Sequence, residues 1–276
     1  MSRRFKQVDV FTSVLGAGNP VAVVLDAQGM SSEQMAAFAA WTNLSETTFV
    51  LAPTEPAADY LVRIFTPTEE LPFAGHPTVG TCHAWLEAGG EPQSSGQIVQ
   101  QCGVGLVTLR RHDGRLAFET PECLRTGAVD ADERSAVLDD LGLSPAEVID
   151  MAWVDNGPGW IGVLVSDVQV LRQLEPTWSR IAVKAGVAAL TGDPAHALEV
   201  RAFFFAGGSR EDPVTGSLNG SLAQWLLGNG TLTAPYVASQ GTAMGRDGRV
   251  FVTQGEDGAI WIGGDAVTGV DGTVAM

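Results

Sequence analysis

The stretch Phe65-Thr-Pro-Thr-Glu-Glu-Leu-Pro-Phe-Ala-Gly-His-Pro-Thr-Val-Gly-Thr-Cys-His-Ala-Trp-Leu-Glu-Ala-Gly-Gly90 has a weaker copy 140 residues further along the chain. At this offset, and without a gap, identical residues recur as the pairs Phe65 and Phe205, Gly80 and Gly220, Trp85 and Trp225, Leu86 and Leu226, and Gly90 and Gly230. Both copies predict the end of a strand, a polar turn with Gly and Pro, and a helix that stops at glycine. The repeat indicates a chain built from two similar halves.

The two repeated helices are predicted to be buried on every side. Residues 78–86 and 218–227 are small or apolar almost all round, which is typical of a helix enclosed by protein. We therefore expect a central helix in each half, at residues 77–89 and 216–228.

The starts of these helices are candidate anion sites. Pro77 suits a first helical position, and Thr215, Gly216 and Ser217 supply hydroxyls for capping and a small residue. A helix start carries unpaired N–H groups and about half a positive charge, so two of them in one cleft would hold a carboxylate between the halves. The alternative is that both turns are ordinary entries to core helices, and the turns alone do not decide between these interpretations.

Length and composition predict two ordinary domains. The chain has 276 residues, of which 45% are hydrophobic and 17% charged, as in compact globular proteins. We place the domains at residues 1–122 and 123–276, with the last strand a candidate to return to the first domain.

The net charge limits the partners. A formal charge of −16 argues against nucleic acid and against anionic membrane surfaces, which are bound through Lys and Arg. No apolar run approaches the roughly 20 residues that cross a bilayer, and the basic start is followed by no apolar segment of a secretory signal. We therefore expect a cytoplasmic protein with no membrane partner.

Metal and pyridoxal phosphate sites are not predicted. Cys82, Cys102 and Cys123 are odd in number and lack Cys-x-x-Cys spacing, which fits neither a disulfide framework nor a zinc site. His76 and His83 lie seven residues apart on the first central helix, too far to share a metal. The only lysines, at positions 6 and 184, stand in no recognisable cofactor context.

Local patterns predict further elements. Ser31 with Gln34 resembles a capping box and predicts a helix at residues 32–42. Residues 178–190 predict another helix, and residues 197–206 predict a buried strand that leads into the second central helix.

Glu46 stands at the polar start of a predicted strand at residues 43–51. A lone glutamate at a strand end is more often a solvated edge residue than a catalyst. However, a carboxylate base beside helix N-termini suits removal of a proton from carbon next to a carbonyl or conjugated acid. In that role the pKa of Glu46 has to be raised, for example by burial against Phe49 or Phe73.

Four motifs carry a resemblance to a known family. They are Asn19-Pro20, Asn43-Leu-Ser-Glu-Thr47, Arg63-Ile-Phe-Thr-Pro-Thr-Glu-Glu-Leu-Pro-Phe-Ala-Gly-His-Pro-Thr-Val-Gly80 and Glu211-Asp-Pro-Val-Thr-Gly-Ser217. Together they resemble the phenazine-biosynthesis PhzF-like family over nearly the whole chain. The resemblance implies an α/β fold of the α+β type, the diaminopimelate-epimerase-like fold. In this fold, two pseudo-symmetric domains each wrap a curled, mostly antiparallel sheet around a buried central helix.

The resemblance also implies site residues. Glu46 is similar to the family's proton-shuttling acid/base, and His76 and Asp212 are its proposed catalytic partners. The positions implied to bind substrate are Ser45, Gly75, Thr215, Gly216 and Ser217. The family is commonly a homodimer and needs no cofactor.

The turns before the central helices decide which reaction we expect. In the related diaminopimelate epimerases two cysteines at these turns act from opposite faces of the carbon, but here both turns lack a thiol and Cys82 lies deeper in its helix. A single carboxylate that removes a proton and returns it elsewhere fits an allylic or keto-enol isomerisation of a small carboxylate-bearing substrate, amino-acid-like or cyclic. The alternatives are a binding or regulatory protein without turnover, and a racemase or epimerase.

Overall fold

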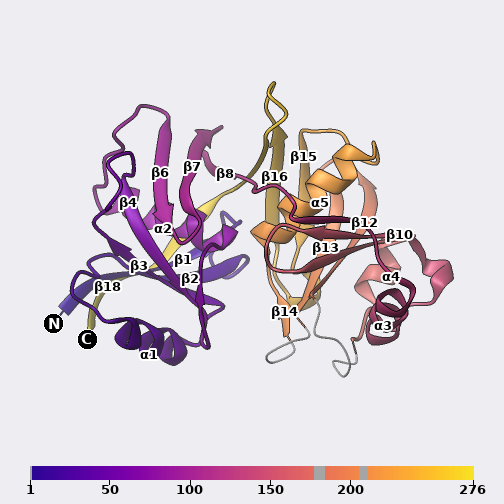
Figure 1. Ribbon diagram of the computed structural model, residues 1–276, viewed down its shortest axis with the longest axis horizontal. Coiled ribbons are helices and arrows are strands. Elements are labelled where there is room, and N and C mark those ends of the chain that lie inside the picture. The colour runs from indigo at the N-terminus through magenta and orange to yellow at the C-terminus, as the bar shows by residue number, and fades with distance from the viewer. Residues whose placement is uncertain (1, 177–183, 205–209) are drawn as a thin grey trace. The chain divides into compact units, whose positions relative to one another are not determined.

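The computed structural model describes residues 2–176, 184–204 and 210–276. The chain forms two compact units (Figure 1). Unit 1 comprises Met1–Glu119 together with Gly263–Met276, and unit 2 comprises Thr120–Ile262. The sequence places the division after residue 122 and names the last strand as a candidate to return to the first domain. In the structure the division falls after Glu119, and Gly263–Met276 belong to unit 1.

Unit 1 is built on a mostly antiparallel sheet. Its strands are β1 (Ser2–Val10), β2 (Asn19–Val24), β3 (Glu46–Leu51), β4 (Tyr60–Phe65), β5 (Glu70–Leu71), β6 (Gln97–Cys102), β7 (Gly105–His112), β8 (Arg115–Glu119) and β18 (Ala266–Ala275). Neighbouring strands are antiparallel except β2 with β3 and β4 with β6. A helix joins each parallel pair, α1 (Ser32–Thr42) the first and α2 (Gly75–Glu87) the second, because parallel strands need a long crossover.

Helix α2 lies inside the curl of this sheet, as predicted for a central helix. It contacts β1, β2, β3, β6, β8 and β18, and its residues 75–82 are all buried. The helix begins at Gly75, so Pro77 occupies its third position rather than its first. Proline is tolerated there because the first N–H groups of a helix have no partner within the helix.

Helix α1 has the bounds that the sequence predicts. The hydroxyl of Ser31 accepts from the Gln34 N–H at 3.2 Å, and the Gln34 side chain accepts from the Ser31 N–H at 2.9 Å. This reciprocal pair is the predicted capping box.

The last strand, β18, lies beside the first. It pairs antiparallel with β1 from one end to the other, and Figure 1 shows the yellow strand near the indigo one at the marked chain ends. The buried Lys6 ties this pair to the central helix, because its Nζ lies 2.7 Å from Asp271 Oδ2 and 3.2 Å from Glu87 Oε2. One side chain thus connects β1, β18 and α2.

Unit 2 repeats this plan. Its strands are β9 (Arg125–Ala128), β10 (Val148–Asp155), β11 (Trp160–Val165), β12 (Lys184–Asp193), β13 (His196–Phe204), β14 (Arg210–Asp212), β15 (Tyr236–Gln240), β16 (Gly248–Gln254) and β17 (Ile260–Gly264), the last of which contains the boundary. Its α-helices are α3 (Ala131–Leu141), α4 (Val168–Arg172) and the central helix α5 (Gly216–Gly228), which has the predicted bounds. In this unit β11 pairs in parallel with β12, and β13 pairs in parallel with β15.

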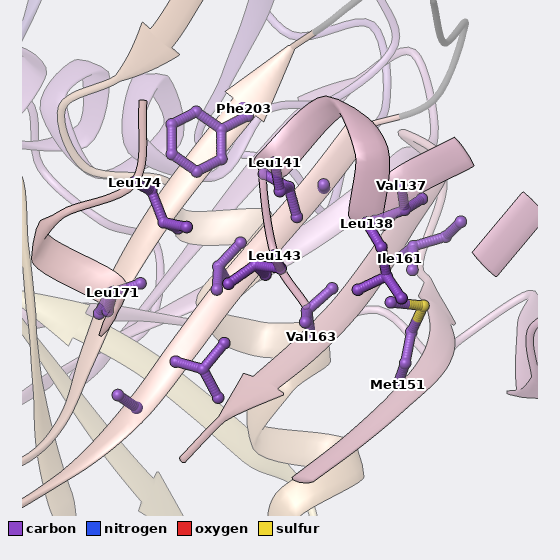
Figure 2. Close-up of a cluster of buried hydrophobic side chains, with 14 of the residues drawn as sticks. Val137, Leu138, Leu141, Leu143, Met151, Ile161, Val163, Leu171, Leu174 and Phe203 are labelled. Carbon is purple, nitrogen blue, oxygen red and sulfur yellow. The ribbon is translucent and has the colours of Figure 1, made fainter. Parts of the chain in front are cut away.

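Helices α3 and α4 cover one face of the unit 2 sheet. Leu138 and Leu141 of α3 and Leu171 of α4 belong to one buried cluster with Ile161 and Val163 of β11 (Figure 2). Burying such side chains contributes about 1.5–3 kcal/mol each. This cluster is the main hydrophobic core on that face.

Helix α5 packs on the opposite face. Because strand residues alternate between faces, Gly162 and Gly186 point away from the α3 cluster. A side chain at Gly186 would collide with Leu218 of α5, and one at Gly162 would be in tight contact with Trp225 of the same helix. The absence of side chains at these two glycines allows the central helix to approach the sheet closely.

The predicted helix at residues 178–190 is wrong for its described part. Residues 184–190 belong to β12, while residues 178–183 lie outside the described residues. Ala185 and Val187 face the α3 cluster and Gly186 faces α5, so this strand is buried on both faces and shows no polar alternation. Its alanines favour helix in isolation, and tertiary packing overrides that preference.

The strand register extends the internal repeat. Tyr60 pairs with Gln100 between β4 and β6, and Val200 pairs with Gln240 between β13 and β15. Both residues of the second pair are displaced by 140 from the first. The repeated position Phe205 lies outside the described residues.

Replacing Gly80 by Ala should lower the free energy of unfolding by about 1–3 kcal/mol, because a methyl group there would overpack against Val10 and Val21. The matched control is Gly228→Ala in α5, where an added β-carbon would meet no described atom of a neighbouring element within 4 Å. Alanine at that position should be neutral or stabilise by up to about 1 kcal/mol. Urea unfolding measures both variants, and equal stabilities would contradict the close packing at Gly80.

Candidate functional site

The parallel pairing of β2 and β3 places two polar side chains at one edge of unit 1. Val21 of β2 pairs with Glu46 of β3. Asn19 is the first residue of β2 and Glu46 is the first of β3, so both stand where their strands begin. The chain reaches Glu46 from α1 through Asn43, which ends the helix in the left-handed conformation at φ 54°.

His76, in the first turn of α2, lies between these two side chains. Its Nε2 is 3.4 Å from Glu46 Oε2, and its Nδ1 is 3.4 Å from Asn19 Nδ2. The side chain of His76 is 5% exposed and that of Glu46 is 12% exposed, while Asn19 is entirely buried. Glu46 is therefore not a solvated edge residue.

Two further predicted residues adjoin this pair along the chain. Ser45 is half-buried and directly precedes Glu46, and Gly75 is buried and begins α2. The N-cap residue of α2 is Ala74, which makes no side-chain capping bond. The first turn of this helix is thus not capped by its own N-cap side chain.

In unit 2, Asp212 and Thr215 form a buried network with Gln240. The Thr215 hydroxyl donates to Asp212 Oδ2 at 2.6 Å. Thr215 is the N-cap residue of α5, but this hydroxyl makes no capping bond, so its predicted capping role is wrong. The hydroxyl oxygen accepts from Gln240 Nε2 in place of a helix N–H, and its bond to the Asp212 carboxylate is of the stronger, charge-assisted kind.

Gln240 supports the network from β15. Its Nε2 donates to Thr215 Oγ1 and to the carbonyl oxygen of Asp212, each at 3.0 Å. Its Oε1 accepts from the Thr215 N–H at 3.0 Å and from Asn219 Nδ2 at 2.8 Å. One buried amide therefore fixes both the turn and the first residues of α5.

The other predicted residues of unit 2 follow this turn. Gly216 is buried at the start of α5. The Ser217 hydroxyl accepts from Trp160 Nε1 at 3.2 Å, and the Ser217 carbonyl oxygen accepts from Asn156 Nδ2 at 2.9 Å. Ser217 is thus held from both its side chain and its backbone.

The predicted site residues therefore form two groups. Unit 1 holds Glu46 and His76 in contact, with Ser45 and Gly75 next to them in sequence, and unit 2 holds Asp212, Thr215, Gly216 and Ser217.

Sequence reasoning missed two buried amides that hydrogen-bond to the central helices. Gln100 in unit 1 donates to Thr78 Oγ1 of α2 at 2.9 Å, and Gln240 holds α5 in unit 2. These two glutamines are separated by the same 140 residues as the repeat. Continuing the comparison of the two copies beyond Gly90 would have found them.

The cysteines are poorly suited to act as bases. Burial raises the pKa of Cys82 to about 12 and that of Cys123 to about 11, and it also raises the pKa of Cys102. The thiolate is the reactive form, so these side chains are almost entirely protonated at neutral pH.

The described part of the chain has neither a cluster of metal ligands nor a helix that could span a membrane. No group of three or more His, Cys, Asp or Glu side chains in this part of the chain could hold a metal ion. No described helix is both long enough and apolar enough to cross a membrane.

The chain is similar over nearly its whole length to curated proteins. It is 34% identical over 291 residues to antisense-enhancing sequence 1 of Schizosaccharomyces pombe, with 97% of each chain covered. It is 32% identical over 284 residues to trans-2,3-dihydro-3-hydroxyanthranilate isomerase of Pseudomonas fluorescens, with 98% of each chain covered. An uncharacterized isomerase of Pasteurella multocida is 32% identical over 263 residues, which cover 94% of this chain and 90% of that protein.

Solved structures share the fold. A PhzF-family protein of Bacillus anthracis matches over 100% of both chains with a TM-score of 0.83 and 24% identity. A hydroxyproline epimerase of Agrobacterium vitis matches 100% of this chain and 93% of its own with a TM-score of 0.59 and 15% identity. These likenesses confirm the predicted fold class, an α+β fold of the diaminopimelate-epimerase-like type.

The named isomerases among these relatives define the class of protein, which is an isomerase. The family model described as phenazine biosynthesis-like protein matches residues 8–272, and the chain belongs to this PhzC-PhzF family, as the resemblance predicts.

The raised thiol pKa values predict the labelling pattern of the native protein. At pH 8, Cys82 should react with a thiol reagent at least about tenfold more slowly than a free cysteine, because it is fully buried and its pKa is about 12. Peptide mass spectrometry after timed labelling gives the rate at each cysteine, and the same reaction in denaturant is the control. Labelling of native Cys82 at the denatured rate would contradict its burial.

Proposed function

We propose that the protein is a cofactor-independent isomerase that moves a proton on a small carboxylate-bearing substrate, with Glu46 as the acid/base. The observation that carries this proposal is the 3.4 Å contact between Glu46 Oε2 and His76 Nε2 in a largely buried setting. A general base must be held within reach of its proton and partly shielded from water, and this contact holds the carboxylate in place.

Comparison of the two units supports a single base. Glu46 pairs with Val21, and the residue displaced by 140 from Val21 is Ile161, which pairs with Ala185. The corresponding position of β12 therefore carries no ionisable group. At the same offset His76 corresponds to Gly216, so the acid and imidazole pair has no counterpart in the repeat.

The reaction proposed is an allylic or keto-enol isomerisation. Glu46 removes a proton from a carbon that is activated by conjugation to the carboxylate and returns it to another carbon of the same conjugated system. The imidazole Nε2 lies 3.4 Å from Glu46 Oε2 and keeps the carboxylate oriented. The substrate and product have the same atoms, so no oxidant or second substrate is needed.

The second group of residues is proposed to assist. Asp212 would take part in proton transfer or bind the polar groups of the substrate, and its carboxylate is held by Thr215. Gly216 and Ser217, in the first turn of α5, would bind the substrate anion through backbone N–H groups, together with Ser45 and Gly75.

The relatives suggest a substrate to test. One similar protein is named for trans-2,3-dihydro-3-hydroxyanthranilate, a cyclic amino acid. We propose this class of substrate, cyclic or amino-acid-like, for the present chain. A homodimeric state and a cytoplasmic location stay predictions.

The test replaces Glu46 by Gln and measures deuterium incorporation into trans-2,3-dihydro-3-hydroxyanthranilate in heavy water. The variant should bind the compound as the parent does, but incorporate deuterium about 10²- to 10⁴-fold more slowly, since it lacks the base. Mass spectrometry measures incorporation and calorimetry measures binding. Glu33→Gln, on the exposed first turn of α1, is the matched control and should retain the parental rate.

Three other results would contradict parts of this proposal. If the Glu46 variant exchanges at the parental rate, Glu46 is not the base. If the parent binds the compound without chemical change, the protein is a binding protein of this fold. If the product keeps its double bonds and has one inverted centre, the enzyme is an epimerase.

A further inference from the structure

The imidazole of His76 is held on both sides by polar side chains. Nε2 faces the Glu46 carboxylate and Nδ1 faces the Asn19 amide nitrogen, each at 3.4 Å. His76 is 4% exposed and Asn19 is entirely buried, so bulk water does not compete freely for the ring nitrogens. The protonation of this ring is therefore set by its neighbours.

The chemistry of the two neighbours selects one form of the ring. A neutral imidazole has one N–H donor and one acceptor nitrogen. An ionised carboxylate only accepts, so Glu46 favours a proton on Nε2. Nδ1 is then the acceptor and needs a donor, which the NH₂ group of Asn19 supplies. With the amide oxygen turned toward Nδ1, the neutral ring would instead present an unprotonated Nε2 to the carboxylate.

The segment before Asn19 restrains the position of the Asn19 side-chain amide. Asp9 is 3% exposed, and its Oδ2 accepts from the N–H groups of Gly16 at 2.6 Å and Gly18 at 3.2 Å. A side chain at Gly18 would collide with the carbonyl oxygen of Val10. Asn19 itself is opposite Val10 in the β1–β2 pair. The turn therefore has little freedom to move the amide away from His76.

We infer that Asn19 is a positioning residue that fixes His76 as the neutral, Nε2-protonated tautomer. In this form the ring has no free basic nitrogen, because Nε2 already carries a proton and the Nδ1 lone pair accepts from Asn19. His76 can then only donate toward Glu46, and the proton removed from the substrate stays on the carboxylate. The catalytic consequence rests on the proposed function of Glu46, whereas the tautomer does not.

The direct test is ¹⁵N NMR of the whole protein labelled at its histidines, of which there are four. Protonated and unprotonated ring nitrogens have well-separated ¹⁵N shifts, and His76→Gln identifies the signals of His76 by their loss. At neutral pH the ring of His76 should show a protonated Nε2 and an unprotonated Nδ1. A proton on Nδ1, alone or together with one on Nε2, would overturn the inference.

The variant Asn19→Asp tests the cause. A carboxylate at Nδ1 accepts only, so it should draw a proton to Nδ1 and change the ¹⁵N pattern of His76. The rate constant kcat for exchange should fall by roughly 10- to 100-fold, the range known for residues that hydrogen-bond to metal-binding histidines, while KM changes little. Asn229→Asp, at the exposed end of α5, makes the same chemical change and should alter neither quantity.

The outcomes separate this inference from the proposed function. If the parent shows the expected tautomer but never exchanges substrate protons, the proposed function fails and the assignment of Asn19 stands. If the parent exchanges protons and Asn19→Asp leaves the His76 tautomer unchanged, Asn19 does not fix the ring and the inference fails. The NMR measurement on the parent needs no variant, so misfolding of Asn19→Asp leaves it decisive.

Discussion

Each unit depends on enclosing a nearly uncharged helix within its own sheet. The contact is close because glycines stand where other side chains would collide, such as Gly80 in unit 1 and Gly186 against α5 in unit 2. The position of each helix is also fixed by hydrogen bonds. Gln100 in unit 1 bonds to α2, and Gln240 in unit 2 bonds to α5. A buried amide without partners costs about 1–3 kcal/mol, so these bonds fix the helix in one position.

This shared scaffold carries different side chains in the two units. In unit 1, β2 begins with Asn19 and β3 begins with Glu46. The strand of unit 2 that corresponds to β3 is β12, and it has small residues there, such as Ala185 and Gly186, that allow close packing. The two units of the repeat therefore have equivalent backbones, but their ionisable side chains stand at different positions. Glu46 and His76 of unit 1 have no counterparts at the corresponding positions of unit 2. The difference favours chemistry with one base over chemistry with two symmetric ones.

The sequence predicts the repeated helices well, because they follow from a local pattern. Motifs also single out Glu46 and His76, which the structure places 3.4 Å apart. Sequence reasoning fails where burial overrides local preference, as in β12, whose alanines suggest a helix. It also misses Gln240, since a polar residue inside a strand has no local signature of the partners it meets in the folded chain. The tautomeric role of Asn19 depends on two contacts from distant segments and needs coordinates to be seen.

Because β18 belongs to unit 1, unit 1 cannot finish folding during synthesis until all of unit 2 has been made. Residues 120–262 leave the ribosome as one continuous segment, so every strand of unit 2 is available while unit 1 still lacks the neighbour of β1. Asp271, the partner of Lys6, is made after the whole of unit 2. Until then the nascent chain exposes an unpaired strand edge on β1, the kind of surface that chaperones protect.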